Sequence, residues 1–212
     1  MIKAVLFDLD GVLINTEHIN TKAAILSMRE QGTKLTSADK KFITGRNPVD
    51  YSLDFAKKYK FDRGKMLVSH ALHYERLYYT AKRYSYSHDF VLRVRKLGFK
   101  TALVTSAERD TVGNALRVLN LKDSAFDTFV TFEECRKHKP SPAPYLMAAR
   151  RLKLKPSECV VIEDSIAGVL SAKRAKMKCI AVTNSYPASK LKKADLIVKS
   201  LTDKRVMEFL TC

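Results

Sequence analysis

The sequence predicts an α/β fold, a doubly wound, Rossmann-like parallel sheet with a small α-helical domain inserted after the first strand. Three features of the chain support this prediction. Short, continuous apolar runs recur along it, amphipathic stretches of helical length separate these runs, and one long interval near the beginning has helical periodicity without a comparable apolar run. Continuous apolar runs are typical of strands that helices cover on both faces, as in a parallel sheet.

Each apolar run is expected to form one buried strand and is followed by polar or acidic residues. The runs are Ala4 to Phe7, Thr101 to Val104, Thr128 to Val130, Val160 to Ile162, Ile180 to Val182, and Leu196 to Val198. Between them, helical periodicity is clearest over Thr111 to Leu119, Pro144 to Leu152, and Ile166 to Lys176. This alternation predicts a doubly wound sheet whose ligand site lies at the carboxyl ends of the strands.

The interval from Thr16 to Tyr86 interrupts the alternation. It has helical periodicity with turn signals at Gly32, Gly45 and Gly64, and Asn47 is placed to cap a helix. We therefore predict a core of residues 1–15 and 87–212 and a helical cap domain of residues 16–86. Such a cap would overhang the strand ends where ligands bind.

Composition indicates a folded protein of the ordinary globular kind. The 212 residues are 46% hydrophobic and 29% charged, and no apolar window approaches the length of a membrane span. The four cysteines form no CxxC pair, so reduced thiols and a cytoplasmic location are the simplest interpretation. A monomer and a homodimer both agree with the sequence.

The formal net charge of +17 raises the possibility of a nucleic-acid partner. However, the basic residues occur in short clusters along the whole chain instead of one concentrated stripe. We therefore expect a solvated surface, or a general attraction for phosphorylated ligands, and no specific nucleic-acid binding.

Two carboxylates follow the first predicted strand at i, i+2 spacing. Asp8 and Asp10 would lie on one side of an extended backbone. Paired buried acids are costly unless a positive group lies between them, and a hard divalent cation is the usual one. An acidic turn or a helix cap would give the same pair, so the pair alone does not decide the chemistry.

Further polar residues follow other predicted strands. Thr105 and Ser106 offer hydroxyl and backbone groups for phosphoryl oxygens, Lys139 offers a cation, and Glu163 and Asp164 offer more carboxylates. If the sheet is parallel, these residues converge at one edge.

These segments resemble the four motifs of the haloacid dehalogenase superfamily, in the branch of beta-phosphoglucomutase and related phosphatases. The matching segments are Asp8-Leu9-Asp10-Gly11-Val12-Leu13, Leu103-Val104-Thr105-Ser106-Ala107, Lys139-Pro140-Ser141-Pro142, and Val161-Ile162-Glu163-Asp164-Ser165. The resemblance runs through nearly the whole core and is weak in the insert.

The resemblance implies a role for each motif residue. Asp8 would attack phosphorus, and Asp10 would protonate the leaving oxygen and then activate water. Thr105, Ser106 and Lys139 would hold the phosphoryl group.

A magnesium site is also implied by the resemblance. Mg²⁺ would be held by Asp8, the carbonyl of Asp10, and Asp164, with Glu163 as a nearby carboxylate. In the insert, Arg46 matches the arginine that relatives place over the substrate.

Three functions remain open at this point. The first is a magnesium-dependent phosphatase that hydrolyses a small phosphorylated metabolite, such as a sugar phosphate, through an aspartyl-phosphate. The second is a phosphosugar mutase of the beta-phosphoglucomutase type, which would use the same core residues. The third is a catalytically idle, basic binding protein on the same fold, against which the intact acids and Lys139 argue.

Overall fold

The computed structural model describes residues 1–44, 46 and 48–211 of the chain. These residues form two compact units, one of residues 1–15 and 82–212 and one of residues 16–81. We call them the core unit and the helical unit. Gly45, where a turn was predicted, and Asn47, predicted as a helix cap, lie outside the described residues.

The core unit is built on a six-stranded sheet in the order β5-β4-β1-β6-β7-β8. Its strands are β1 Ala4–Phe7, β4 Lys100–Val104, β5 Thr128–Val130, β6 Cys159–Glu163, β7 Lys178–Val182 and β8 Leu196–Val198, all paired in parallel. All six predicted apolar runs form strands of this sheet. The predicted α/β fold class is therefore confirmed.

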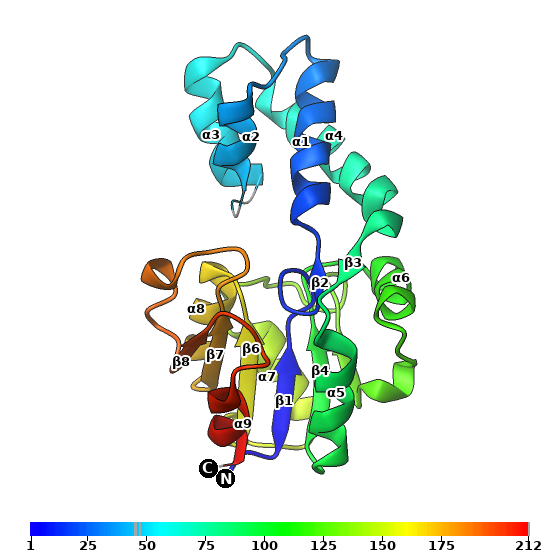
Figure 1. Cartoon of the computed structure of the whole chain (residues 1–212), viewed down its shortest axis with the longest axis vertical. Coiled ribbons are helices and arrows are strands. Elements are labelled where there is room, and N and C mark those ends of the chain that lie inside the picture. Colours follow the sequence, from blue (N-terminus) through cyan, green and yellow to red (C-terminus); the bar gives the residue numbers. More distant parts are fainter. Residues whose placement is uncertain (45, 47, 212) are drawn as a thin grey trace. The chain divides into compact units, whose positions relative to one another are not determined.

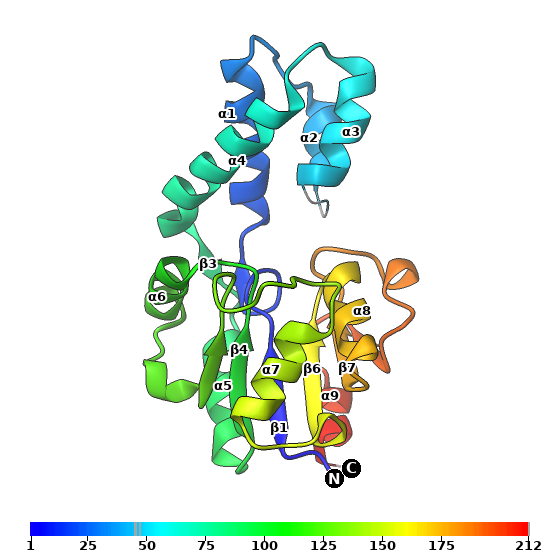
Figure 2. The ribbon, with the colours of Figure 1, turned by 180° about the vertical axis from the view of Figure 1, so that it is seen from behind.

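Helices cover both faces of the sheet. Those of the core unit are α5 Ser87–Lys96, α6 Arg109–Leu119, α7 Ala143–Arg151, α8 Ile166–Arg174 and α9 Lys204–Thr211. Figure 1 shows α5 and α9 in front of the sheet, and the reverse view in Figure 2 shows α7 and α8 in front. Short 3-10 turns at Asp123–Ala125, Pro156–Glu158 and Ala188–Lys190 connect these elements.

Side-chain alternation along β1 supplies both halves of the core. Ala4 and Leu6 belong to the cluster that includes Tyr145 of α7 and Val169 of α8. Phe7 points to the other face, where its ring makes edge contacts with Phe90 of α5, 6.1 Å between centroids. Every β1 side chain is buried, and because β1 lies between β4 and β6, the carboxylate that follows it lies at the centre of the sheet.

The helical unit contains α1 Glu17–Glu30, α2 Ser37–Ile43, α3 Pro48–Lys58, α4 Arg63–Leu77 and the 3-10 turn Tyr78–Thr80. Sequence-encoded caps begin two of these helices: Thr36 and Asp39 form a capping box on α2, and the Asp62 side chain accepts from the backbone N–H of Lys65 on α4. The hydrophobic core of the helical unit includes Met28, Ile43, Tyr51, Phe55 and Met66.

Two short strands join the units. β2 Ile14–Asn15 pairs in antiparallel fashion with β3 Lys82–Arg83. Residues 82–86, which the helical periodicity assigned to the insert, group with the core unit because of this pairing. Among the described residues, no helix has the length and apolar character that crossing a bilayer requires.

Candidate active site

The candidate site lies at the carboxyl edge of the core sheet, where several strands end in polar residues. Asp8 follows β1 and Thr105 follows β4. Glu163 is the last residue of β6, and Asp164 follows it. β1 lies between β4 and β6, so these groups share one edge. All four of these residues are buried.

Lys139 connects this edge to the loop before α7. Its ammonium donates to Asp8 Oδ1 at 2.5 Å, to Glu163 Oε1 at 2.8 Å and to the carbonyl of Val104 at 3.0 Å. An ammonium has three protons, so these acceptors match its full donor capacity. The side chain is only 7% exposed, and Asp8 and Glu163 hold the pKa of Lys139 above its usual range in spite of burial.

Glu163 is held on both of its oxygens. Oε1 accepts from Lys139 and from the Tyr145 hydroxyl at 2.9 Å, and Oε2 accepts from the backbone N–H groups of Asp164 and Ser165 and from the Ser165 hydroxyl. Burial alone would raise the pKa of Glu163, but Lys139 and these hydrogen bonds lower it. Glu163 is therefore an ionised anchor for Lys139 and for the start of α8.

Asp164 lies directly against the loop that follows β1. A Cβ atom on Gly11 would meet Asp164 Oδ2 at 1.7 Å, and Gly11 has a positive φ of 81°. Only glycine satisfies both conditions, which explains the glycine after Asp10. The Ser185 hydroxyl donates to the same Asp164 oxygen, and Asn184 donates to the Gly11 carbonyl at 2.7 Å.

Asp8, Glu163 and Asp164 form a buried acidic cluster. One carboxylate oxygen from each lies within 4.8 Å of the others. Burial, followed by the charge of Glu163, raises the pKa of Asp164 well above its usual range. Burial also raises the pKa of Asp8 to about 7, although Lys139 opposes the change.

This donor set fits a hard divalent cation. Lys139 supplies one positive charge to three carboxylates, and two of them keep a raised pKa. Carboxylate oxygens are ligands that magnesium prefers. Because both oxygens of Glu163 are already hydrogen-bonded, Asp8 and Asp164 are better suited to direct coordination than Glu163.

The remaining predicted core residues lie in adjoining loops. The Thr105 hydroxyl accepts from the backbone N–H of Ala107 at 3.0 Å, which shapes the loop after β4, and Ser106 is exposed in that loop. Asp10 is half-buried and forms an isolated bridge with Ile14 in the turn after β1.

Arg46 belongs to the helical unit. Its guanidinium forms an ion pair with Asp54 at 2.7 Å and lies over the Phe42 ring, 4.0 Å from the centroid. These two contacts hold the arginine, which precedes α3, against Asp54 of α3 and Phe42 of α2, and its role toward a substrate stays a prediction.

Sequence reasoning missed three side chains of this site. Tyr145 fell within a predicted core helix and gave no sign that its hydroxyl contacts Glu163. Asn184 and Ser185 follow β7, and that position at a strand end was the signal that could have identified them.

Comparison with known proteins identifies the family. Residues 5–182 match the model of haloacid dehalogenase-like hydrolases. The chain belongs to this family. The predicted resemblance is thereby confirmed.

Several curated relatives of the chain are named phosphatases. It is 30% identical to validoxylamine A 7'-phosphate phosphatase of Streptomyces hygroscopicus subsp. limoneus, with 97% of each chain covered. It is 29% identical to hexitol phosphatase A of Escherichia coli, with 94% of this chain and 91% of that protein covered. The chain is thus a phosphatase-type member of its family.

Solved structures extend the comparison to mutases. A beta-phosphoglucomutase from Clostridium difficile superposes with a TM-score of 0.76 at 26% identity, covering 100% of this chain and 98% of that one. A protein named as a mutase therefore shares this architecture.

Proposed function

We propose that this chain is a magnesium-dependent phosphatase that hydrolyses a small phosphomonoester through a phosphoryl-aspartate on Asp8. The observation that carries the proposal is the position of the Asp8 carboxylate: it is buried at the end of the central strand, hydrogen-bonded to Lys139 and clustered with Glu163 and Asp164. Family membership and the phosphatase relatives support the same reaction class.

The first half-reaction transfers the phosphoryl group to Asp8. A carboxylate oxygen of Asp8 forms a bond to phosphorus while the bond between phosphorus and the ester oxygen breaks. Asp10, in its acid form, gives its proton to the departing oxygen, which leaves as an alcohol.

The second half-reaction returns Asp8 to its carboxylate form. Asp10, now ionised, takes a proton from a water molecule, and the water oxygen attacks phosphorus. The bond between Asp8 and phosphorus breaks, and inorganic phosphate leaves.

Lys139 and the loop after β4 would hold the transferring group. Lys139 stays protonated, because Asp8 and Glu163 raise its pKa, and Glu163 holds its ammonium beside Asp8 at each stage. Thr105 and Ser106 would donate to phosphoryl oxygens from the neighbouring strand end.

Asp8, the carbonyl of Asp10, and Asp164 would hold Mg²⁺. Ser185 orients Asp164 through its hydroxyl, and Gly11 leaves the space in which that carboxylate lies. When bound, the metal would supply positive charge between the nucleophile and the phosphoryl oxygens.

Selection of the substrate is assigned to the helical unit, which we propose acts as a cap, with Arg46 contacting the substrate. We expect a small phosphorylated metabolite, such as a sugar phosphate, and a cytoplasmic enzyme. The three described cysteines are free thiols, which agrees with a reducing compartment.

A phosphosugar mutase is the second candidate, because the structural neighbour named above is a mutase. Water is favoured as the acceptor because Asn20 stands where the mutase pattern has a histidine, and no lysine of the insert matches the mutase's substrate-binding lysine. The Asn20 amide instead donates to the backbone carbonyl of Arg46 at 3.1 Å.

A screen of phosphorylated metabolites tests the proposal. Free phosphate is measured with magnesium and with EDTA, and beta-glucose 1-phosphate with a trace of glucose 1,6-bisphosphate is followed for glucose 6-phosphate. We expect magnesium-dependent phosphate release from at least one sugar phosphate without isomer formation. Fast isomerisation with little phosphate release would identify a mutase instead.

A further inference from the structure

The amino-terminal edge of the core sheet carries a concentration of lysines. Lys3 precedes β1, Lys100 begins β4 in register with Ala4, and Lys178 begins β7 in register with Val160. The turns that enter β6 and β7 add further cations. The complete set, which we call the lysine edge, is Lys3, Lys100, Lys153, Lys155, Lys176 and Lys178, all exposed.

The carboxylates that precede the strands neutralise only one lysine of this edge, Lys3. Glu158 pairs with Lys3 at 2.7 Å, while Asp127 and Asp195 pair with cations outside the set, Arg95 and Lys173. The other five lysines of the edge form no ion pair within the part of the chain that the structure describes. Lys100 donates to the carbonyl of Leu152 and Lys178 lies over the Phe209 ring, but neither contact neutralises the charge. The unneutralised cations make this edge positive, and a positive surface attracts an anionic partner.

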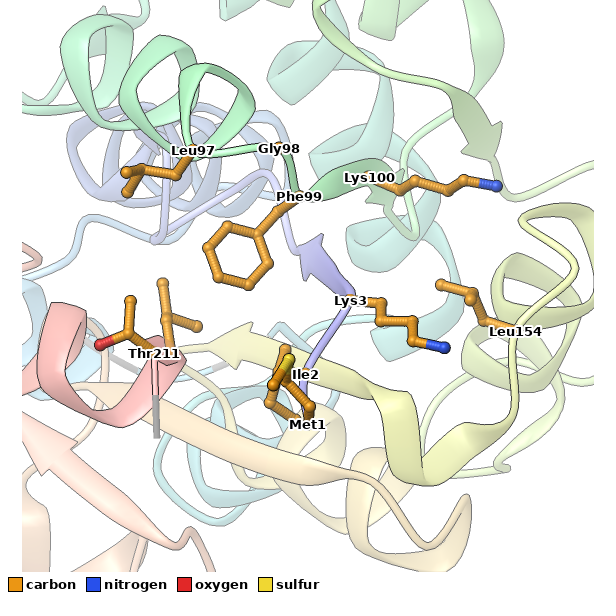
Figure 3. A pocket seen from close by; sticks show the side chains of 10 residues that line it. Met1, Ile2, Lys3, Leu97, Gly98, Phe99, Lys100, Leu154 and Thr211 are labelled. Atoms are coloured by element: carbon orange, nitrogen blue, oxygen red, sulfur yellow. The ribbon is translucent and has the colours of Figure 1, made fainter.

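An apolar pocket opens at the same edge. It has a volume of about 450 Å³ and is lined by Ile2, Leu97, Phe99 and Leu154, among others. Figure 3 shows the Phe99 ring between Leu97 and Ile2, with the ammonium ends of Lys3 and Lys100 on the side of Leu154. Leu97 is 52% exposed, so the pocket is accessible from solvent.

We propose that the lysine edge and this pocket bind an acidic segment of a partner protein that inserts one apolar side chain. The lysines provide charge complementarity, which sets orientation and association rate, and the pocket provides an apolar anchor point. A pocket of about 450 Å³ is in the range that holds a small ligand, so it has room for one large apolar side chain and the peptide backbone beside it. A single-stranded nucleic acid would insert a base, which needs aromatic side chains to stack on, whereas the lining of this pocket has one aromatic ring, Phe99, among aliphatic side chains. A membrane surface would need a protruding apolar face instead of a hollow.

This surface is independent of the proposed phosphatase reaction. Parallel strands place their amino and carboxyl ends on opposite edges of the sheet, so the lysine edge lies on the far side from Asp8. Phosphatase activity can therefore serve as a folding control for the variants in the binding experiment. Failure of the binding proposal would leave the proposed phosphatase reaction untouched, and the reverse also holds.

The test is fluorescence anisotropy with a labelled synthetic peptide of aspartate, glutamate, serine and glycine that carries one central phenylalanine. A second peptide has serine in place of the phenylalanine. The full-length protein is compared with Lys153→Glu/Lys155→Glu and with a control of equal charge change, Lys199→Glu/Lys204→Glu. Lys199 and Lys204 are exposed residues that follow the carboxyl end of β8.

We expect the phenylalanine peptide to bind at physiological salt, and Lys153→Glu/Lys155→Glu to weaken it by about 10-fold or more, while the control pair changes it by less than about 3-fold. Leu97→Gln should reduce the preference of the protein for the phenylalanine peptide over the serine peptide. Leu92→Gln is the control, because Leu92 lies in α5, has a similar exposed fraction and does not line the pocket, and it should leave that preference unchanged.

Three results would overturn the proposal. The first is that neither peptide binds. The second is that Lys153→Glu/Lys155→Glu and the control pair lose the same peptide affinity, which would mean that only the general charge of the protein attracts the peptide. The third is tighter binding of a short single-stranded DNA or of vesicles containing phosphatidylserine than of the peptide.

Discussion

Replacing Asp8 with asparagine should stabilise the metal-free protein at alkaline pH. Burial is the main cause that raises the pKa of Asp8 from 3.8 to about 7, and Glu163 and Asp10 add to it while Lys139 opposes it. A carboxyl group whose pKa is raised by folding destabilises the folded state once it ionises. The asparagine variant removes that charge and keeps the shape of the side chain.

The size and the pH range of the effect follow from these two pKa values. Below pH 3.8 the carboxyl group is protonated in the folded and unfolded states, so it costs nothing there. As pH rises from 3.8 to about 7, the unfolded state ionises first and wild-type protein progressively loses about 4 kcal/mol of stability, since one pKa unit is worth roughly 1.4 kcal/mol. The loss is complete above about pH 7. For a chain of this length, that is a difference in Tm of about 10 °C.

Thermal unfolding in EDTA between pH 5 and pH 8.5 measures the difference. Asp110→Asn, at an exposed carboxylate of α6, is the control and should follow wild type. Excess magnesium should raise the Tm of wild type more than that of Asp8→Asn, because the variant lacks one anionic ligand. If Asp8→Asn is no more stable than wild type at pH 8 in EDTA, the cluster does not carry the electrostatic cost inferred from its burial.

Three further substitutions test separate parts of the site. Asp10→Asn should slow turnover by on the order of 10²- to 10⁴-fold, and less for p-nitrophenyl phosphate, whose leaving group needs little protonation; equal losses for all leaving groups would indicate a structural role. Asp164→Ala should raise the magnesium concentration needed for half-maximal activity, and coincident titration curves would exclude it as a ligand. Gly168→Ala should lower both Tm and activity, because a Cβ there would meet Glu163 Oε1 at 1.7 Å, whereas Gly113→Ala, with nothing within 4 Å, should be tolerated.

The sheet was predictable because burial on both faces leaves a local signal in the sequence. Runs such as Val160 to Ile162 are continuously apolar, and the structure extends this one only to Cys159–Glu163. β2 and β3 were not predicted, since two-residue strands contain no periodicity to detect and depend on their pairing with each other.

The site was predictable to the extent that its residues follow strands. Asp8 and Asp164 meet because the sheet is parallel and β1 pairs with β6. The sequence predicted that these residues share one edge of a parallel sheet, but it did not predict which strands pair. The network around Lys139 was not predictable, because Tyr145 reaches Glu163 from a helix whose apolar pattern gives no information about a hydroxyl contact. Such contacts depend on three-dimensional packing across 18 residues of chain.

The central claim is that Asp8 becomes phosphorylated during turnover. Wild-type protein and Asp8→Asn are mixed with a substrate from the metabolite screen and magnesium, quenched in acid during steady-state turnover, and analysed by intact-mass spectrometry with peptide mapping. The account predicts an adduct of one phosphoryl group on the peptide containing Asp8 in wild type, and neither adduct nor phosphate release in Asp8→Asn. Turnover by Asp8→Asn at a rate near that of wild type, or an adduct on another residue, would contradict it.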